Sequence, residues 1–138
     1  SFSRKVANNI LKKLIPNIYF LQNNKKIILK SIVAGGYRRK SNKLKDLDIL
    51  FIHSCDTETD ILEHLGLNII TNLKRLSYSG GNRKRKLIIK YNNKIYGIDI
   101  FLVLKKELPF ALLHHTGNYV FNIKLRIHAN KNVLISRS

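Results

Sequence analysis

The spacing of apolar residues predicts a helix at the start of the chain. Apolar side chains recur there every three or four positions and basic residues fill the opposite side, the apolar set being Val6, Ile10, Leu11, Leu14 and Ile15. This pattern is typical of an amphipathic helix over residues 3–15. We expect it to end at Pro16, because proline lacks the N–H that a continuing helix requires.

Short apolar runs rich in β-branched residues follow this helix. The second half of residues 27–34 leads into two glycines, and residues 47–52 read "LDILFI". Runs of this length predict strands, the second of them central in a sheet and buried on both faces. In residues 56–66, acids in the first turn and a glycine at the end predict a capped helix.

The next segment has the pattern of an antiparallel hairpin. "KLIIKY" and "KIYGIDIFLVL" flank Asn92 and Asn93, and asparagine tolerates the positive φ angles of a tight turn. Pro109 then opens a short helix, and Val120, Phe121, Lys124 and Ile127 at helical spacing predict a last helix within residues 118–130. The whole pattern predicts one α/β (α+β) domain, a twisted mixed or antiparallel sheet with helices on one side.

The charge of the chain predicts a polyanionic partner. Its 138 residues include 26 lysines and arginines but 8 aspartates and glutamates, a formal net charge of +18. Nucleic acid is the favoured partner, because phosphate contacts reward an excess of cations. An anionic membrane surface is the weaker alternative, since the cations are spread along the chain and do not line one amphipathic helix.

Other features of the composition predict a soluble intracellular protein, in the nucleus or the cytoplasm. No apolar run approaches the ~18 residues of a membrane helix, and the first residues lack the apolar block of a signal peptide. Cys55 is the single cysteine, so no internal disulfide can form. The chain has no methionine even at position 1, which suggests a piece of a longer protein.

Three aspartates are candidates for a metal site. Asp46 and Asp48 project the same way at the start of the "LDILFI" strand, and Asp99 lies in "YGIDIFLVL" among large apolar residues. If the two strands are neighbours, the three carboxylates converge. Carboxylates packed that closely repel one another unless cations neutralise them, and an all-oxygen site suits Mg²⁺. The alternative for any single aspartate is an ordinary turn or cap residue.

Two glycines ahead of these aspartates are candidates for a phosphate site. Gly35 and Gly36 end a predicted strand, where backbone N–H groups can approach an anion closely. Arg38 and Arg39 follow, and a guanidinium can form a two-pronged contact with a triphosphate. A plain glycine turn followed by two solvated arginines is the alternative.

The order Gly-Gly, Asp-x-Asp and a distant third Asp resembles the nucleotidyltransferase superfamily that includes DNA polymerase beta. "AGGYRRKSNKLKDLDILF", "YGIDIFLVL" and "FALLHHTGNYVFNIKLRIHAN" are similar to the palm and early thumb of X-family DNA polymerases, a likeness that covers residues 3–132. The resemblance implies a palm-type nucleotidyltransferase domain over residues 1–108 and the start of a thumb-like helical segment over 109–138. Gly97 departs from the family, where many members have an arginine.

The resemblance also implies roles for individual residues. Asp46, Asp48 and Asp99 would be the catalytic residues and would bind two Mg²⁺ ions, for which Mn²⁺ can substitute. The nucleotide would be held by Gly35, Gly36, Arg39, Lys45, His114, His115, Gly117 and Asn122. The template strand would contact Arg126. For the phosphates of duplex DNA the candidates are the four cations Arg83, Lys84, Arg85 and Lys86, whose alternative is an ordinary solvated hairpin.

The resemblance implies a DNA-directed DNA polymerase that fills gaps during DNA repair. It would act as a monomer, without a membrane, on primer–template DNA and a deoxynucleoside triphosphate. One alternative is a template-independent nucleotidyltransferase, or one that modifies RNA or a small molecule. A second is a non-catalytic palm that binds nucleic acid. Zinc is disfavoured, because the histidines and Cys55 do not have the spacing of zinc ligands.

Overall fold

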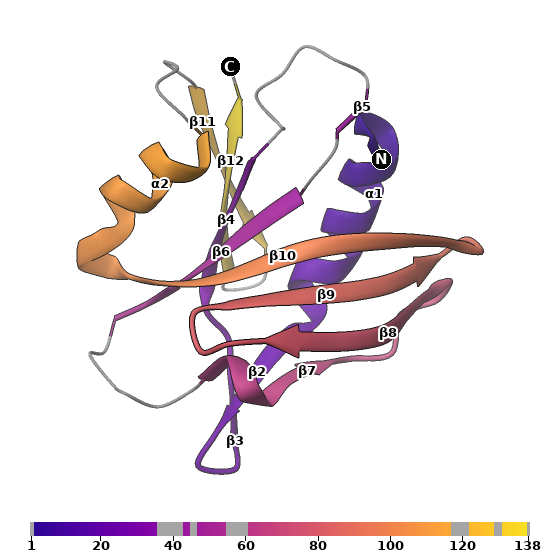
Figure 1. Cartoon of the computed structure of the whole chain (residues 1–138), viewed down its shortest axis with the longest axis horizontal. Helices are drawn as coiled ribbons and strands as arrows, with labels where there is room; N and C mark the ends of the chain where they lie inside the picture. The colour runs from indigo at the N-terminus through magenta and orange to yellow at the C-terminus, as the bar shows by residue number, and fades with distance from the viewer. Residues whose placement is uncertain are drawn as a thin grey trace.

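A computed structural model describes most of the chain: residues 2–35, 43–44, 47–54, 61–116, 122–128 and 131–137. Its centre is a seven-stranded mixed sheet (Figure 1). In spatial order the strands are β11 (Asn122–His128), β12 (Lys131–Arg137), β4 (Lys30–Gly35), β6 (Leu47–His53), β10 (Lys94–Leu104), β9 (Lys84–Tyr91) and β8 (Leu73–Gly80). β6 pairs with β10, and β12 with β4, in parallel; the remaining neighbours are antiparallel.

Smaller elements surround this sheet. β2 (Ile18–Gln22) pairs with both β3 (Lys25–Ile27) and β7 (Leu65–Leu67), and β1 (Phe2–Ser3) pairs with β5 (Lys43–Leu44). The described residues include two α-helices, α1 (Arg4–Leu14) and α2 (Leu108–Thr116). Single 3₁₀ turns occupy Ile15–Asn17, Ile61–His64 and Lys105–Glu107. No helix in the described part of the chain has the length and apolar character that crossing a bilayer requires.

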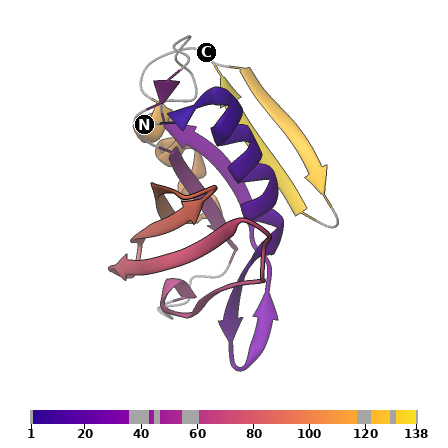
Figure 2. The ribbon, with the colours of Figure 1, turned by 90° about the vertical axis from the view of Figure 1, so that its right-hand side faces the viewer.

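Apolar side chains cover both faces of the sheet. On one face, α1 packs in the larger core cluster, which includes Leu47, Ile49 and Phe51 of β6. On the other face, α2 packs in a smaller cluster with Leu50 of the same strand. Figure 2 shows α1 in front of the sheet and α2 behind it. The predicted fold class is confirmed, but the expectation of helices on one side is wrong, because a strand that is apolar on both faces needs cover on both.

The first helix forms as its sequence predicts. The Ser3 side chain accepts a hydrogen bond from the backbone N–H of Val6 at 3.2 Å, which caps the first turn. Its apolar stripe is buried, at Ala7, Ile10, Leu11 and Leu14. The helix gives way to a 3₁₀ turn that contains Pro16.

The predicted hairpin is also confirmed. Asn92 and Asn93 join β9 to β10 with φ angles of 48° and 66°, the left-handed conformation of a two-residue turn. This turn fixes the register of the two strands, so that Lys86 lies opposite Asp99 and Lys90 opposite Ile95.

Two predicted helices are wrong. The segment expected to form the last helix instead contributes β11, and with β12 it forms a hairpin at the edge of the sheet. Ile123, Leu125 and Ile127 alternate with polar residues, and this period of two outweighs the helical spacing. The division at residue 108 stays a prediction, although β12 pairs with β4 of the proposed first unit.

The helix predicted over residues 56–66 is limited, in its described part, to one 3₁₀ turn. β7 follows directly, with Gly66 paired to Tyr19. A Cβ at Gly66 would lie 2.2 Å from the tyrosine ring. Glycine is therefore required at position 66 because the ring of Tyr19 lies close to its backbone, and it does not cap a helix.

Candidate active site

Two carboxylates lie side by side at the centre of the sheet. The parallel register of β6 and β10 places Asp48 beside Asp99. The residues that flank both aspartates belong to the core cluster under α1: Leu47, Ile49, Ile98 and Ile100. Because successive side chains of a strand point to opposite faces, both aspartates project from the other face, on which α2 packs. The condition set in the sequence analysis, that these two strands are neighbours, is met.

Both aspartates are largely withdrawn from solvent. The side chain of Asp48 is 15% exposed and that of Asp99 is 16% exposed. The Nζ of Lys86 lies 3.7 Å from Oδ1 of Asp99, which is an ion pair without a hydrogen bond. Among the described residues this oxygen has no hydrogen-bond partner. A buried carboxylate oxygen without a donor is costly, so Asp99 is placed to interact with a group outside the described residues.

His115 is the main contact of Asp48 in the described structure. Its Nδ1 lies 3.1 Å from Oδ2 of Asp48, and its side chain is 11% exposed. The ring also packs against Phe101, with centroids 4.2 Å apart, and against His114 at 5.0 Å. His115 therefore holds the orientation of the Asp48 carboxylate through a hydrogen bond from α2, a contact that the sequence did not predict.

The four cations proposed for DNA contacts do not form one patch. Arg83 donates to Glu107 at 3.2 Å, and Arg85 donates to the Gly81 carbonyl at 2.9 Å. Lys84 lies over the Phe101 ring at 5.4 Å, and Lys86 pairs with Asp99. Strand alternation separates them, because Lys84 and Lys86 share the face of Asp99 whereas Arg85 lies on the opposite face.

The nucleotide residues proposed from the sequence are described only in part. Gly35 ends β4 and pairs with Leu47, so the start of the glycine pair lies next to the strand of Asp48. His114 helps to line a hollow of about 530 Å³ between α2 and β10. The backbones of Asn122 and Arg126 belong to β11. Other proposed residues lie outside the described part of the chain: Gly36, Arg39, Lys45, Asp46 and Gly117.

The carboxylate pair fits a divalent cation. In the described part of the chain, no three histidine, cysteine, aspartate or glutamate side chains gather as a metal centre. Asp48 and Asp99 nevertheless could offer oxygen ligands from adjacent strands, and Asp99 has a buried oxygen that no donor among the described residues satisfies. Hard cations such as Mg²⁺ prefer such ligands.

The ion pair between Lys86 and Asp99 could have been predicted from the sequence. A two-residue turn at Asn92 and Asn93 places each residue of the first strand opposite one definite residue of the second. Counting back from the turn puts Lys86 opposite Asp99. The Asp48–His115 contact has no such local signal, because it joins residues 67 positions apart.

The described fold, a mixed sheet covered by helices, is that of a nucleotidyltransferase palm. No family model matches the chain. It is 35% identical over 134 residues to the repair DNA polymerase X of African swine fever virus (strain Badajoz 1971 Vero-adapted), which covers 93% of this chain and 72% of the viral protein. It is 38% identical over 110 residues to the same protein of isolate Tick/Malawi/Lil 20-1/1983, or 77% of this chain and 60% of the relative.

A bacterial protein shows the same relationship over a shorter part of its length. The DNA polymerase/3'-5' exonuclease PolX of Bacillus subtilis (strain 168) is 31% identical over 101 residues, or 72% of this chain and 16% of that protein. The chain belongs to the X family of DNA polymerases and is a nucleotidyltransferase.

Proposed function

We propose that this chain extends a DNA primer on a template and fills short gaps during DNA repair. The primer 3′-hydroxyl would attack the α-phosphorus of a deoxynucleoside triphosphate. A new O–P bond forms, the bond to the bridging oxygen breaks, and pyrophosphate leaves. The viral relatives are named repair polymerases, which supports the setting that we infer for this chain.

The observation that carries the proposal is the carboxylate pair, with its unsatisfied oxygen on Asp99. We infer that Asp48 and Asp99, with Asp46, hold two divalent cations, Mg²⁺ or Mn²⁺. When bound, these cations would neutralise the carboxylates and stabilise the charge that develops on the transferring phosphoryl group. Asp99 would lie nearest the primer end, and its role is to orient the hydroxyl for attack.

His115 and Lys86 would support this pair from two sides. The hydrogen bond from His115 limits the rotation of the Asp48 carboxylate, so that the side chain is already oriented before substrate arrives. Lys86 reduces the repulsion between the two carboxylates while the cations are absent, and its half-exposed side chain can move away when they bind. Both are positioning residues.

The experiment is primer extension by an Asp99→Ala variant. We expect extension to be lost while binding of primer–template duplex persists, because the substitution removes a cation ligand and leaves the basic surface intact. Glu63→Gln is the matched control, since it removes one exposed carboxylate on another part of the chain. Normal extension by Asp99→Ala would show that the assignment is wrong.

Reactions without template, and with ribonucleotides, separate the alternatives. Extension that needs no template, or that prefers ribonucleotides, would replace the proposed activity by another nucleotidyl transfer. Salt-sensitive DNA binding without turnover at any divalent cation would support a non-catalytic binding module.

A further inference from the structure

A pair of lysines lies in direct register on the outer strands of the sheet. Lys90 of β9 is opposite Lys74 of β8 on one side and Ile95 of β10 on the other. Both lysines are exposed. Like charges directly opposite each other on neighbouring strands are destabilising, and no carboxylate among the described residues forms an ion pair with either. An anion between them would remove the repulsion.

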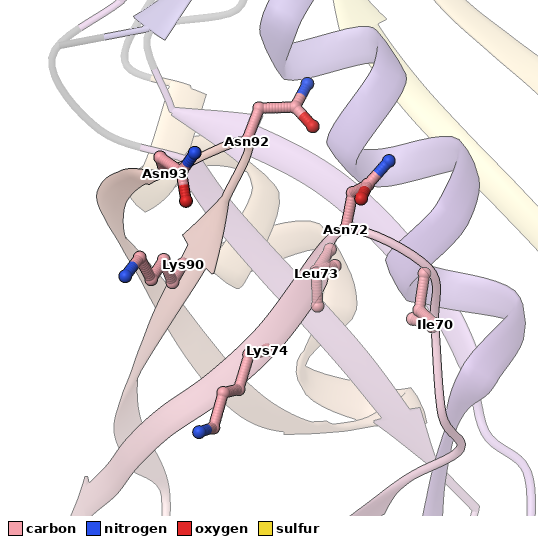
Figure 3. A pocket seen from close by; sticks show the side chains of 7 residues that line it. All are labelled: Ile70, Asn72, Leu73, Lys74, Lys90, Asn92 and Asn93. Atoms are coloured by element: carbon pink, nitrogen blue, oxygen red, sulfur yellow. The ribbon is translucent and has the colours of Figure 1, made fainter.

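Three asparagines line a cavity together with this pair. Lys74 and Lys90 line a cavity of about 520 Å³ together with Asn72, Asn92 and Asn93 (Figure 3). All three asparagines have positive φ angles, and the N–H of Asn92 donates to the Asn72 carbonyl at 3.1 Å. That bond ties the two turns together beside the lysines. The amides of Asn72 and Asn92 point away from the ammonium groups in Figure 3, so the two lysines supply the donors that a phosphate would meet.

This cavity adjoins the face that carries the candidate active site. In β10 the positions of Ile95, Gly97 and Asp99 alternate with core residues, so all three lie on one face. Lys90 and Lys74 share that face through their register with Ile95. α2 packs at the other end of β10, near Val103, and Ile95 remains 67% exposed.

We propose that Lys74 and Lys90 bind one backbone phosphate in the duplex part of primer–template DNA. This inference rests on the proposed function for its partner. A nucleic-acid backbone is the source of phosphate that fits, since the chain carries a net charge of +18 and the lysine pair lies on the same face of the sheet as Asp99.

The position of the site predicts which phosphate it binds. Four residues of β10 separate Ile95 from Asp99, about 14 Å along the strand, and Lys74 lies two strands away, about 10 Å across. The direct separation is therefore roughly 17 Å. At 3.4 Å of helix rise per nucleotide, the bound phosphate would lie about five nucleotides from the primer end.

The first test is the salt dependence of duplex binding by the double variant Lys74→Ala, Lys90→Ala. Removing one phosphate contact should reduce the slope of log affinity against log salt concentration by about 0.9. The matched control is Lys5→Ala, Lys12→Ala, which removes two exposed lysines from α1 on the other face and should leave the slope unchanged. An unchanged slope in the first variant, or an equal change in both, would overturn the proposal.

The second test locates the phosphate. Single neutral methylphosphonate linkages are placed in turn along each strand of the duplex. In the unsubstituted protein, one linkage four to six nucleotides from the primer end should weaken binding, and the Lys74→Ala, Lys90→Ala variant should lose that sensitivity. The inference is contradicted if the lysine substitutions abolish sensitivity only to a linkage at the primer end itself. It is also contradicted if they abolish sensitivity to no linkage.

The two proposals fail separately. If the unsubstituted protein does not extend a primer, the proposed polymerase activity is wrong, whereas the salt and linkage experiments still decide whether the lysine pair binds duplex phosphate. Suppose instead that the unsubstituted protein extends a primer normally and that the lysine variant extends it equally well at saturating DNA. If the variant then shows no change in salt slope and no change in sensitivity to the neutral linkage, only the inference about the lysine pair is refuted.

Discussion

The carboxylate pair predicts that removing one aspartate stabilises the protein when cations are absent. Asp48 and Asp99 occupy adjacent strands about 5 Å apart. At the effective dielectric constant of ~20 that suits such sites, two unit charges at that separation repel by about 3 kcal/mol. The attraction of Lys86 for Asp99 offsets less than about 1 kcal/mol of this, because the lysine side chain is 52% exposed.

The isosteric change Asp99→Asn should therefore raise the free energy of unfolding by about 2 kcal/mol in EDTA. For a domain of this size that is about 6 °C in the unfolding midpoint. Excess MgCl₂ should make the unsubstituted protein the more stable of the two. A ligand at one hundred times its dissociation constant stabilises a protein by about 2.7 kcal/mol, and only the protein with both carboxylates gains the full effect.

Thermal unfolding followed by circular dichroism, with and without MgCl₂, measures both effects. Glu63→Gln is the control, because it raises the net charge by the same amount at an exposed site. A midpoint for Asp99→Asn several degrees below that of the unsubstituted protein in EDTA would refute the reasoning, since it would mean that Asp99 stabilises the fold.

Three further predictions concern stability and can be measured by urea unfolding. Gly66→Ala should cost about 1 to 3 kcal/mol by forcing the ring of Tyr19 to move, and adding Tyr19→Ala should remove most of that cost; additive losses would exclude the clash. Phe51→Ala should cost about 3 to 5 kcal/mol, because its ring is 2% exposed and packs edge-on against Phe20 at 5.1 Å; a loss below 1 kcal/mol would contradict its place in the core. Asn93→Ala should destabilise the turn by about 1 kcal/mol whereas Asn93→Gly is tolerated, and equal effects would argue against the positive φ.

Local patterns in the sequence predicted the elements that are stabilised by residues close in the chain. The first helix and the turn at Asn92 and Asn93 depend on residues that are close in the chain, and both are confirmed. β4 and β6 were identified from composition and length alone. The prediction of a last helix was wrong because residues 118–130 fit both the helical period and the period of two of a strand. Pairing with β12, which lies outside that segment, favours the strand.

The candidate site was predictable to the extent that it depends on strand register. Alternation along β6 and β10 predicted that Asp48 and Asp99 could meet, provided that the two strands are neighbours, and the parallel pairing satisfies that condition. The sequence could not predict the contact of His115, because it depends on how α2 packs against the sheet. Nor did it predict the pairing of Lys74 with Lys90, since the irregularity in β8 after Arg75 gives that strand no simple pattern.

The pairing of β12 with β4 has a consequence for how the protein is made. Val133 is the partner of Ser31, about one hundred residues earlier. During synthesis on the ribosome, the backbone donors and acceptors along that side of β4 must wait for residues 131–137 to emerge. Pairings between such distant segments form slowly, so nascent chains at this stage would present an open strand that invites association with other nascent chains.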